Sequence, residues 1–277
     1  MTRFFRRGLP LRYRICLALL LAVRPASADE LQVGPSLHYF DYSEFTDDGS
    51  RFNRETGFLP GFQIGVDNLA SQDFRAHLEA EFYRGTVDYD GQTQNGVPHS
   101  TESDTTLYRL GGSVSYAFKD NFQSYLLLRY LRWDRSIRDN FNSILGANVP
   151  GVNEQYRWKE AGVGARAHLG CQPDCRWLLD VALLRVLDPE IQINLEDRGF
   201  GSPVLHLGEE YGVRAQLAWM LHWQENRRIN LNLYYEAWDF GRSADVVVNR
   251  GTLFLVVREP RSETRSAGAR LTFTFLF

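Results

Sequence analysis

The sequence contains little sulfur and no long hydrophobic run. Its 277 residues include two methionines and three cysteines. The longest unbroken apolar stretch is the nine residues from Ile15 to Val23. A membrane-spanning helix needs about 20 such residues, so the sequence excludes a helical membrane protein.

An excess of charge of one sign is also missing. The formal net charge is −3, and both signs are spread along the chain. A nucleic-acid-binding protein needs a basic stripe that neutralises phosphates, so we do not expect nucleic acid as a partner. The chain also lacks a nucleophile elbow, a phosphate-binding glycine loop and zinc-ligand spacing, so no cofactor and no metal site is predicted.

The first 28 residues are typical of a cleaved secretory signal peptide. Several arginines precede the apolar run, and Ala26-Ser27-Ala28 forms a small-residue cleavage site. We expect the mature chain to begin at Asp29 and residues 29–277 to form one domain.

The signal peptide sends the chain to an oxidising compartment, which bears on its cysteines. Cys16 lies within the signal, so Cys171 and Cys175 are the cysteines of the mature chain. The surrounding sequence offers neither a histidine cluster nor a second cysteine pair to complete a zinc site. The pair therefore predicts a disulfide that closes a five-residue turn.

Apolar and polar residues alternate along most of the mature chain, which is the period of a β-strand. In the segment D-F-R-A-H-L-E-A-E-F-Y, Phe74, Leu78 and Phe82 lie on one face and Arg75 and Glu79 lie on the other. One face suits lipid and the opposite face suits water. Strands of a soluble sandwich also alternate, but they are generally shorter than the segments in this chain.

Ten segments of about 13 to 17 residues show this pattern. They are longer than a tilted membrane strand needs to be. They are residues 31–46, 55–68, 73–88, 104–119, 121–137, 154–169, 175–188, 206–222, 228–242 and 262–277. Short and long connections alternate between them, as in barrels with short periplasmic turns and long extracellular loops. The sequence predicts an all-β fold, a closed antiparallel transmembrane β-barrel.

The strand count has one alternative. Residues 246–257 resemble a small hairpin around Asn249-Arg250-Gly251, and a barrel that included it would have twelve strands. Each arm has only five or six residues, so we place the hairpin outside the barrel.

The C-terminal segment alternates and ends on an aromatic residue, with Phe273, Phe275 and Phe277 on one face. It resembles the terminal recognition strand of bacterial outer-membrane β-barrel proteins. The resemblance covers the mature chain and implies a Gram-negative outer membrane. It also implies, as partners, membrane lipid, lipopolysaccharide, the barrel-assembly machinery and periplasmic chaperones. Four short and five long connections would place both termini in the periplasm.

Six tryptophans lie toward the ends of the predicted strands. Aromatic side chains favour the lipid headgroup region, so we interpret the tryptophans as girdles and only secondarily as a ligand cage. They are Trp133, Trp158, Trp177, Trp219, Trp223 and Trp238.

The alternation also predicts which charges face the barrel lumen. Six arginines and six carboxylates fall on this face, and buried charges of opposite sign are expected to pair. The predicted lumen residues include Arg75, His77, Glu79, Glu81, Arg109, Arg129, Glu160, Arg166, Arg214, Glu236 and Arg270, with Asp180 and Glu210 completing the carboxylates. Ten strands leave little room for water, which favours a filled interior.

These features favour a non-enzymatic barrel, either an envelope or surface protein or a narrow solute channel with a salt-bridged lumen. The alternative is a hydrolase with its site at the extracellular mouth, because the strand number is similar to that of the omptin surface proteases. That family uses an acidic pair opposite an Asp-His pair to activate water. Asp88 and Asp90 match the acidic pair, but the Asp-x-His motif is missing, and His206 is the remaining candidate base.

Overall fold

The computed structural model describes residues 29–69, 73–93, 95–119, 121–172 and 175–277. The predicted signal peptide lies outside these residues and stays a prediction. Within the described ranges, no helix is long and apolar enough to cross a membrane.

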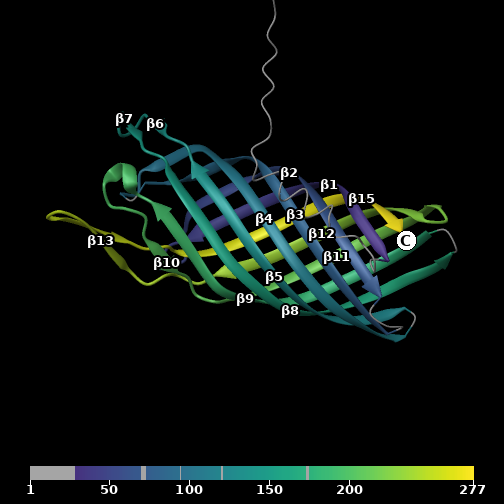
Figure 1. The fold of residues 1–277 in the computed structure, drawn as a ribbon. Coiled ribbons are helices and arrows are strands. Elements are labelled where there is room, and N and C mark those ends of the chain that lie inside the picture. The colour runs from purple at the N-terminus through teal and green to yellow at the C-terminus, as the bar shows by residue number, and fades with distance from the viewer. Residues whose placement is uncertain (1–28, 70–72, 94, 120, 173–174) are drawn as a thin grey trace, which may run out of the picture.

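Ten long antiparallel strands form a closed barrel (Figure 1). They are β1 (Glu30–Phe45), β2 (Arg51–Leu69), β3 (Phe74–Gln92), β4 (Pro98–Lys119), β5 (Phe122–Ile137), β8 (Val152–Gln172), β9 (Cys175–Asn194), β11 (Tyr211–Gln224), β12 (Arg227–Phe240) and β15 (Arg261–Leu276). The first and last strands pair along their whole length, from Glu30 opposite Leu276 to Phe45 opposite Arg261. In the part of the chain that the structure describes, each of the ten long strands therefore pairs with a long strand on both sides.

The remaining elements are short and lie in the long connections. They are β6 (Asn140–Asn142), β7 (Ala147–Val149), η1 (Glu196–Arg198), β10 (Val204–His206), β13 (Val246–Arg250) and β14 (Leu253–Val257). β13 and β14 pair only with each other, so the twelve-strand alternative is wrong and the ten-strand prediction is confirmed.

The connections differ in length between the two ends of the barrel. At one end, which we call the turn end, at most four residues separate consecutive strands, as between Leu69 and Phe74. At the other, the loop end, the connections contain the six short elements. The first and last described residues lie at the turn end, where the Phe277 amide donates to the Asp29 carbonyl at 3.1 Å.

Several strands extend further toward the loop end than the sequence predicted. β2 begins at Arg51 rather than 55, β4 begins at Pro98 rather than 104, and β9 continues to Asn194 rather than 188. The β2 and β4 extensions are mostly polar, which weakens the periodicity, whereas in β9 the alternation resumes at Ile191 and Ile193 after Asp188-Pro189. The predicted strand 206–222 begins at Tyr211, and His206 belongs to β10, which pairs with β9.

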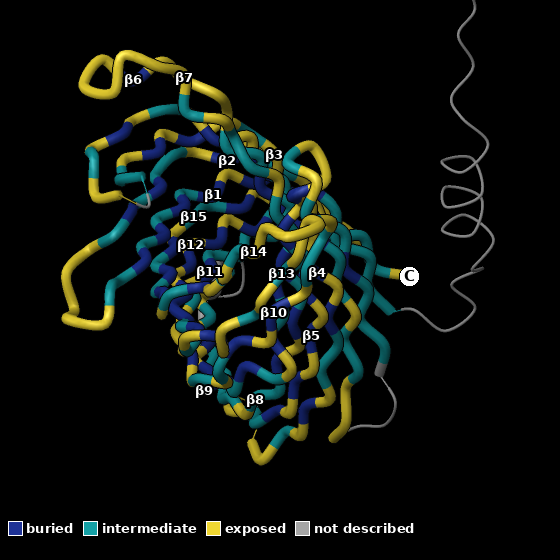
Figure 2. The backbone as a smooth tube through the Cα atoms, turned by 90° about the vertical axis from the view of Figure 1, so that its left-hand side faces the viewer, coloured by how far each residue is buried: buried dark blue, intermediate teal, exposed yellow. Residues whose placement is uncertain are grey.

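Many large apolar side chains are exposed on the outer surface. Buried and more exposed positions alternate along the strands (Figure 2). On β5, Leu126 and Leu128 point outward and are 65% and 69% exposed, with Phe122 and Tyr130 at either end. Beyond Tyr130 the outward positions carry charge, so the apolar band spans about nine residues, as a membrane strand requires.

Inside the barrel, tyrosine rings lie against glycines of neighbouring strands. Tyr125 is directly opposite Gly164, and Tyr234 is directly opposite Gly268. A Cβ at either glycine would overlap the tyrosine ring. The missing side chain lets each ring lie flat on the barrel wall, an arrangement known from other sheets.

Candidate functional site

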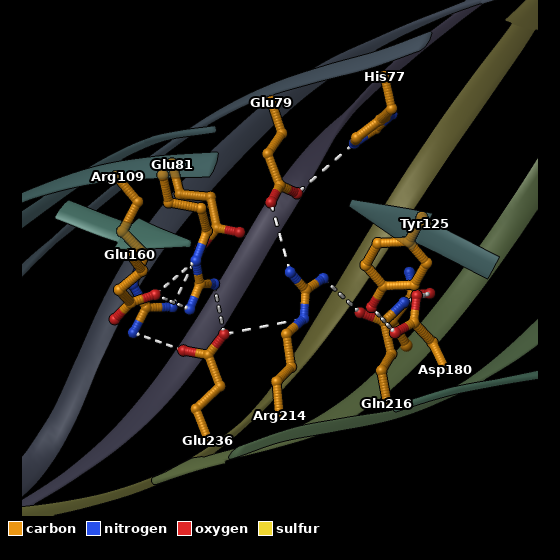
Figure 3. A network of polar contacts seen from close by, with 12 residues as sticks. His77, Glu79, Glu81, Arg109, Tyr125, Glu160, Asp180, Arg214, Gln216 and Glu236 are labelled. Atoms are coloured by element: carbon orange, nitrogen blue, oxygen red, sulfur yellow. Dashed lines mark hydrogen bonds and ion pairs between the residues drawn. The ribbon is translucent and has the colours of Figure 1, made fainter. Parts of the chain in front are cut away.

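A network of buried charges crosses the barrel interior at mid-height (Figure 3). Its centre is Glu236 on β12, which is fully buried. The Glu236 carboxylate lies 2.9 Å from Arg109 on β4, 2.7 Å from Arg129 on β5 and 3.8 Å from Arg214 on β11. One carboxylate therefore connects three arginines from three different strands.

Further carboxylates complete the network around this centre. Arg129 also pairs with Glu160 on β8 at 2.5 Å, and Arg214 also pairs with Glu79 on β3 at 3.5 Å. Glu81 on β3 joins Arg109 at 3.2 Å and Arg270 on β15 at 2.8 Å. The network thus links seven strands.

A second chain of contacts runs from this network toward the turn end. His77 Nε2 lies 3.6 Å from Glu79, and His77 Nδ1 lies 2.9 Å from Asp67. Nearby, Arg166 pairs with Asp180 at 2.6 Å, and the Tyr125 hydroxyl donates to the same carboxylate.

A polar pocket of about 160 Å³ lies at this end of the lumen. Its charged lining residues are Glu30, Asp67, Arg75, His77, Glu79, Arg166, Asp180, Arg214, Arg228 and Arg270. Both signs are present, and most of these groups pair with each other, as Glu30 does with Arg228 at 3.3 Å.

Above the charged network, toward the loop end, aromatic and aliphatic side chains fill the lumen. Trp133 stacks on Tyr156 with 4.5 Å between ring centroids, and the edge of Phe240 meets Trp158 at 5.2 Å. Residues of β13 and β14 pack against this cluster from the loop side. The cluster excludes water from the part of the lumen that it occupies.

A second group of buried charges lies between this aromatic cluster and the loops. Arg135 on β5 pairs with Glu44 at 3.1 Å, Glu55 at 2.9 Å and Glu154 at 3.1 Å. The Tyr156 hydroxyl donates to Glu259 at 2.6 Å. One arginine thus stands among four carboxylates, and we call Arg135, Glu44, Glu55, Glu154 and Glu259 the mouth cluster.

The structure places the predicted lumen residues on the inward face, apart from Glu210, which lies in the connection before β11. All are buried or half-buried except Arg75, which is exposed but lines the pocket at the turn end. The prediction that inward charges of opposite sign balance applies to the central network only. It overlooked the mouth cluster, whose strand members share the inward register of the predicted residues.

The candidate hydrolase residues do not converge on a site. Asp88 and Asp90 point outward from β3 and are exposed, and His206 is exposed on β10. β3 and β10 lie apart in the sheet, with β4, β5, β8 and β9 between them on one side. The structure therefore does not assemble these three side chains at the mouth.

The tryptophan prediction is half wrong. Trp177 and Trp223 are exposed on the outer surface, and Trp219 lies beside Trp177 in a tilted arrangement with 6.5 Å between ring centroids, in agreement with a girdle. Trp133, Trp158 and Trp238 are only 2% exposed and belong to the interior cluster. Their positions share the inward register, which outweighs the interfacial preference of the indole.

Two other predicted features lie at the turn end. Phe273 faces outward near the end of β15, and Phe277 is 72% exposed beyond it. The side chains of Cys171 and Cys175 lie outside the described residues, so their disulfide stays a prediction.

Comparison with known proteins gives a fold but no family. No protein-family model and no curated sequence matches the chain. The outer-membrane protease OmpT from Escherichia coli superposes with a TM-score of 0.61 at 9% identity, covering 90% of this chain and 97% of that one. The chain has the fold of outer-membrane β-barrels.

A second similar structure has a different role. The translocator domain of the autotransporter NalP from Neisseria meningitidis gives a TM-score of 0.51 at 12% identity, covering 96% of this barrel and 94% of that chain. At such identities the similarity concerns the fold alone.

Proposed function

We propose that the protein is a closed, non-enzymatic barrel of the outer membrane that holds its loop-end hairpins at the cell surface. Its termini would lie in the periplasm. The observation that carries this proposal is the filled lumen, in which the Glu236 network and the aromatic cluster around Trp133 succeed each other along the barrel axis.

The energetics of the central network support a closed state. Opening a path past Glu236 would separate it from Arg109, Arg129 or Arg214, and an unpaired buried charge costs several kcal/mol. A narrow channel would need both this separation and movement of the aromatic layer. Barrel diameter also increases with strand number, and a barrel of ten strands is narrow enough for side chains to fill most of its lumen.

The outer surface supports a membrane location. The apolar band between Phe122 and Tyr130 would face lipid, and the charged positions beyond it, such as Arg132 and Asp134, would reach the lipopolysaccharide layer. During biogenesis, the C-terminal strand with Phe273 and Phe277 would meet periplasmic chaperones and the barrel-assembly machinery.

Planar-bilayer recording of the refolded mature chain tests the proposal. A shift in gel mobility on heating shows that the barrel has folded, and a general porin in the same bilayer serves as the positive control. We expect a heat-modifiable protein and no current steps. Discrete steps would overturn the closed barrel and would identify Arg129, Arg214 and Glu79 as pore residues.

A further inference from the structure

The mouth cluster holds the base of an external hairpin. Glu259 lies between β14 and β15, at the base of the connection that contains β13 and β14. Its side chain enters the barrel mouth, where it is 5% exposed. The Glu259 amide donates to Ser243 Oγ at 2.9 Å, and the Ser243 amide donates to the Glu259 carbonyl at 3.0 Å, so both arms of the connection meet at this residue.

Several contacts hold the hairpin, including backbone hydrogen bonds between Gly241 and Gly208. Val246, Val248, Leu255 and Val257 pack against the aromatic cluster. On the exposed side, Asp47 pairs with Arg242 at 2.8 Å and with Arg258 at 3.4 Å, which ties the hairpin base to the connection between β1 and β2. A further contact is the Glu259 carboxyl group itself, whose hydrogen bonds to tyrosine hydroxyls depend on its protonation.

The charge balance around Glu259 is unfavourable for its ionised form. Arg135 makes its ion pairs with the other three carboxylates, and the oxygen of Glu259 meets tyrosine hydroxyls instead. The titratable and charged groups around it are Tyr42 and Glu44 on β1, Glu55 on β2, Tyr89 on β3, Arg135 on β5, and Glu154 and Tyr156 on β8. Four carboxylates with one arginine would leave three uncompensated negative charges in a buried site.

The hydrogen bonds also call for an additional proton. Tyr42 Oη lies 3.0 Å from Glu44, 3.3 Å from Glu259 and 3.2 Å from Tyr156 Oη, while Tyr156 Oη lies 2.6 Å from Glu259. Two hydroxyl hydrogens cannot fill these four contacts. A proton on Glu259 supplies a third hydrogen and removes one negative charge from the cluster.

We propose that Glu259 is a protonated latch, and that its ionisation releases the segment 241–260 from the barrel mouth. Release would expose the inner face of the hairpin and the aromatic cluster beneath it. This inference rests on the proposed function in one respect, namely that the hairpin faces the external medium and senses its pH.

The direction of the pH effect follows from the environment of the carboxyl group. Burial raises the pKa of Glu259 well above its usual range, and Glu44 and Glu154 raise it further, while Arg135 opposes them. A group with a raised pKa stabilises the docked hairpin fully below the ordinary glutamate value of about 4.3. That contribution is lost as the pH rises through the pKa of the docked state. The ratio of docked to released hairpin then falls by up to about tenfold per pH unit.

A nitroxide label on the hairpin tests the latch. Val247 is 58% exposed on β13, and Val247→Cys in a Cys171→Ser/Cys175→Ser background gives a single labelling position in the mature chain. We expect the mobile fraction of the spectrum to increase severalfold between pH 5 and pH 9. Glu259→Gln, which stays neutral, should keep the label immobile at every pH.

Glu263→Gln is the matched control, because Glu263 lies on β15 outside the cluster and pairs with Arg261 and Arg265. It should respond to pH as the parent does. A spectrum that does not change with pH, or an equal change in Glu259→Gln, overturns the latch even if the bilayer stays silent. Current steps at pH 5 combined with an intact pH response would instead overturn the closed barrel and support the latch.

Discussion

Arg109 and Glu236 lie on β4 and β12, which are not neighbours in the sheet, and their side chains meet at 2.9 Å across the lumen. Their ion pair connects opposite walls of the barrel. Contacts of this kind stabilise the barrel cross-section independently of the strand ladder, so they can be tested without disturbing backbone pairing.

Replacement of Glu236 by glutamine should destabilise the barrel strongly. The change removes one negative charge from among three arginines, and breaking a buried pair costs about 3–5 kcal/mol. Urea unfolding in lipid vesicles, followed by heat-modifiability on a gel, measures this loss. Glu209→Gln breaks the exposed pair with Arg185 and should change the free energy of unfolding by no more than about 1 kcal/mol. If both variants lowered the free energy of unfolding equally, Glu236 would not stabilise the barrel through its arginine partners.

Substitution of Gly164 by alanine should also destabilise the barrel, by about 1–3 kcal/mol, because the new methyl group overlaps the Tyr125 ring. Ala165→Val, one residue along on the outward face, is the control and should be nearly neutral. A Tyr125→Ala/Gly164→Ala double variant should deviate from additivity by at least about 0.5 kcal/mol, because the two positions are in contact. Strict additivity would show that the ring does not depend on the glycine.

The loop-end turn between β1 and β2 should stay ordered in moderately acidic solution. Hydrogen bonds from Thr46 and Ser50 lower the pKa of Asp48 to about 2. A group with a lowered pKa stabilises the turn above its ordinary value near 3.9, and that stability is lost as the pH falls through 2. The Ser50 amide resonance should therefore titrate with a midpoint near 2 in the wild type and not at all in Asp48→Asn. A midpoint near 4 would contradict these hydrogen bonds.

The cysteine prediction needs a chemical test. We expect the mature protein purified from an oxidising compartment to resist thiol labelling and to gain two labels after reduction. Because the loop between Cys171 and Cys175 is short, removing the bond should cost less than about 3 kcal/mol. Labelling before reduction would show that the thiols are free.

Period-2 alternation predicted most of this fold, because a strand between lipid and a packed lumen has two chemically distinct faces. The inward positions of Arg129 and Glu236 follow directly from that pattern. Their partners across the lumen do not, because which inward residues meet depends on strand tilt and barrel closure. The prediction failed for Trp133, where residue preference was weighed above register.

The mouth cluster was harder to predict for a different reason. Glu44, Glu55 and Glu154 lie on strands at the loop end, where outward residues are polar as well and the contrast between faces is weak. Glu259 belongs to a loop without any period. The sequence therefore carried no signal that these carboxylates would share one arginine.

The position of Glu236 also bears on how the barrel assembles. Two of its arginine partners, Arg109 and Arg129, lie on β4 and β5, far from β12 in the chain, whereas Arg214 lies directly opposite it on the neighbouring β11. An incompletely closed sheet would hold Glu236 apart from Arg109 and Arg129 in a wet interior, and these charges would meet only as the first and last strands join. Water would then leave the lumen late, and the network would stabilise a partially assembled sheet only slightly. The pairing of β1 with β15 would therefore be the cooperative step of folding.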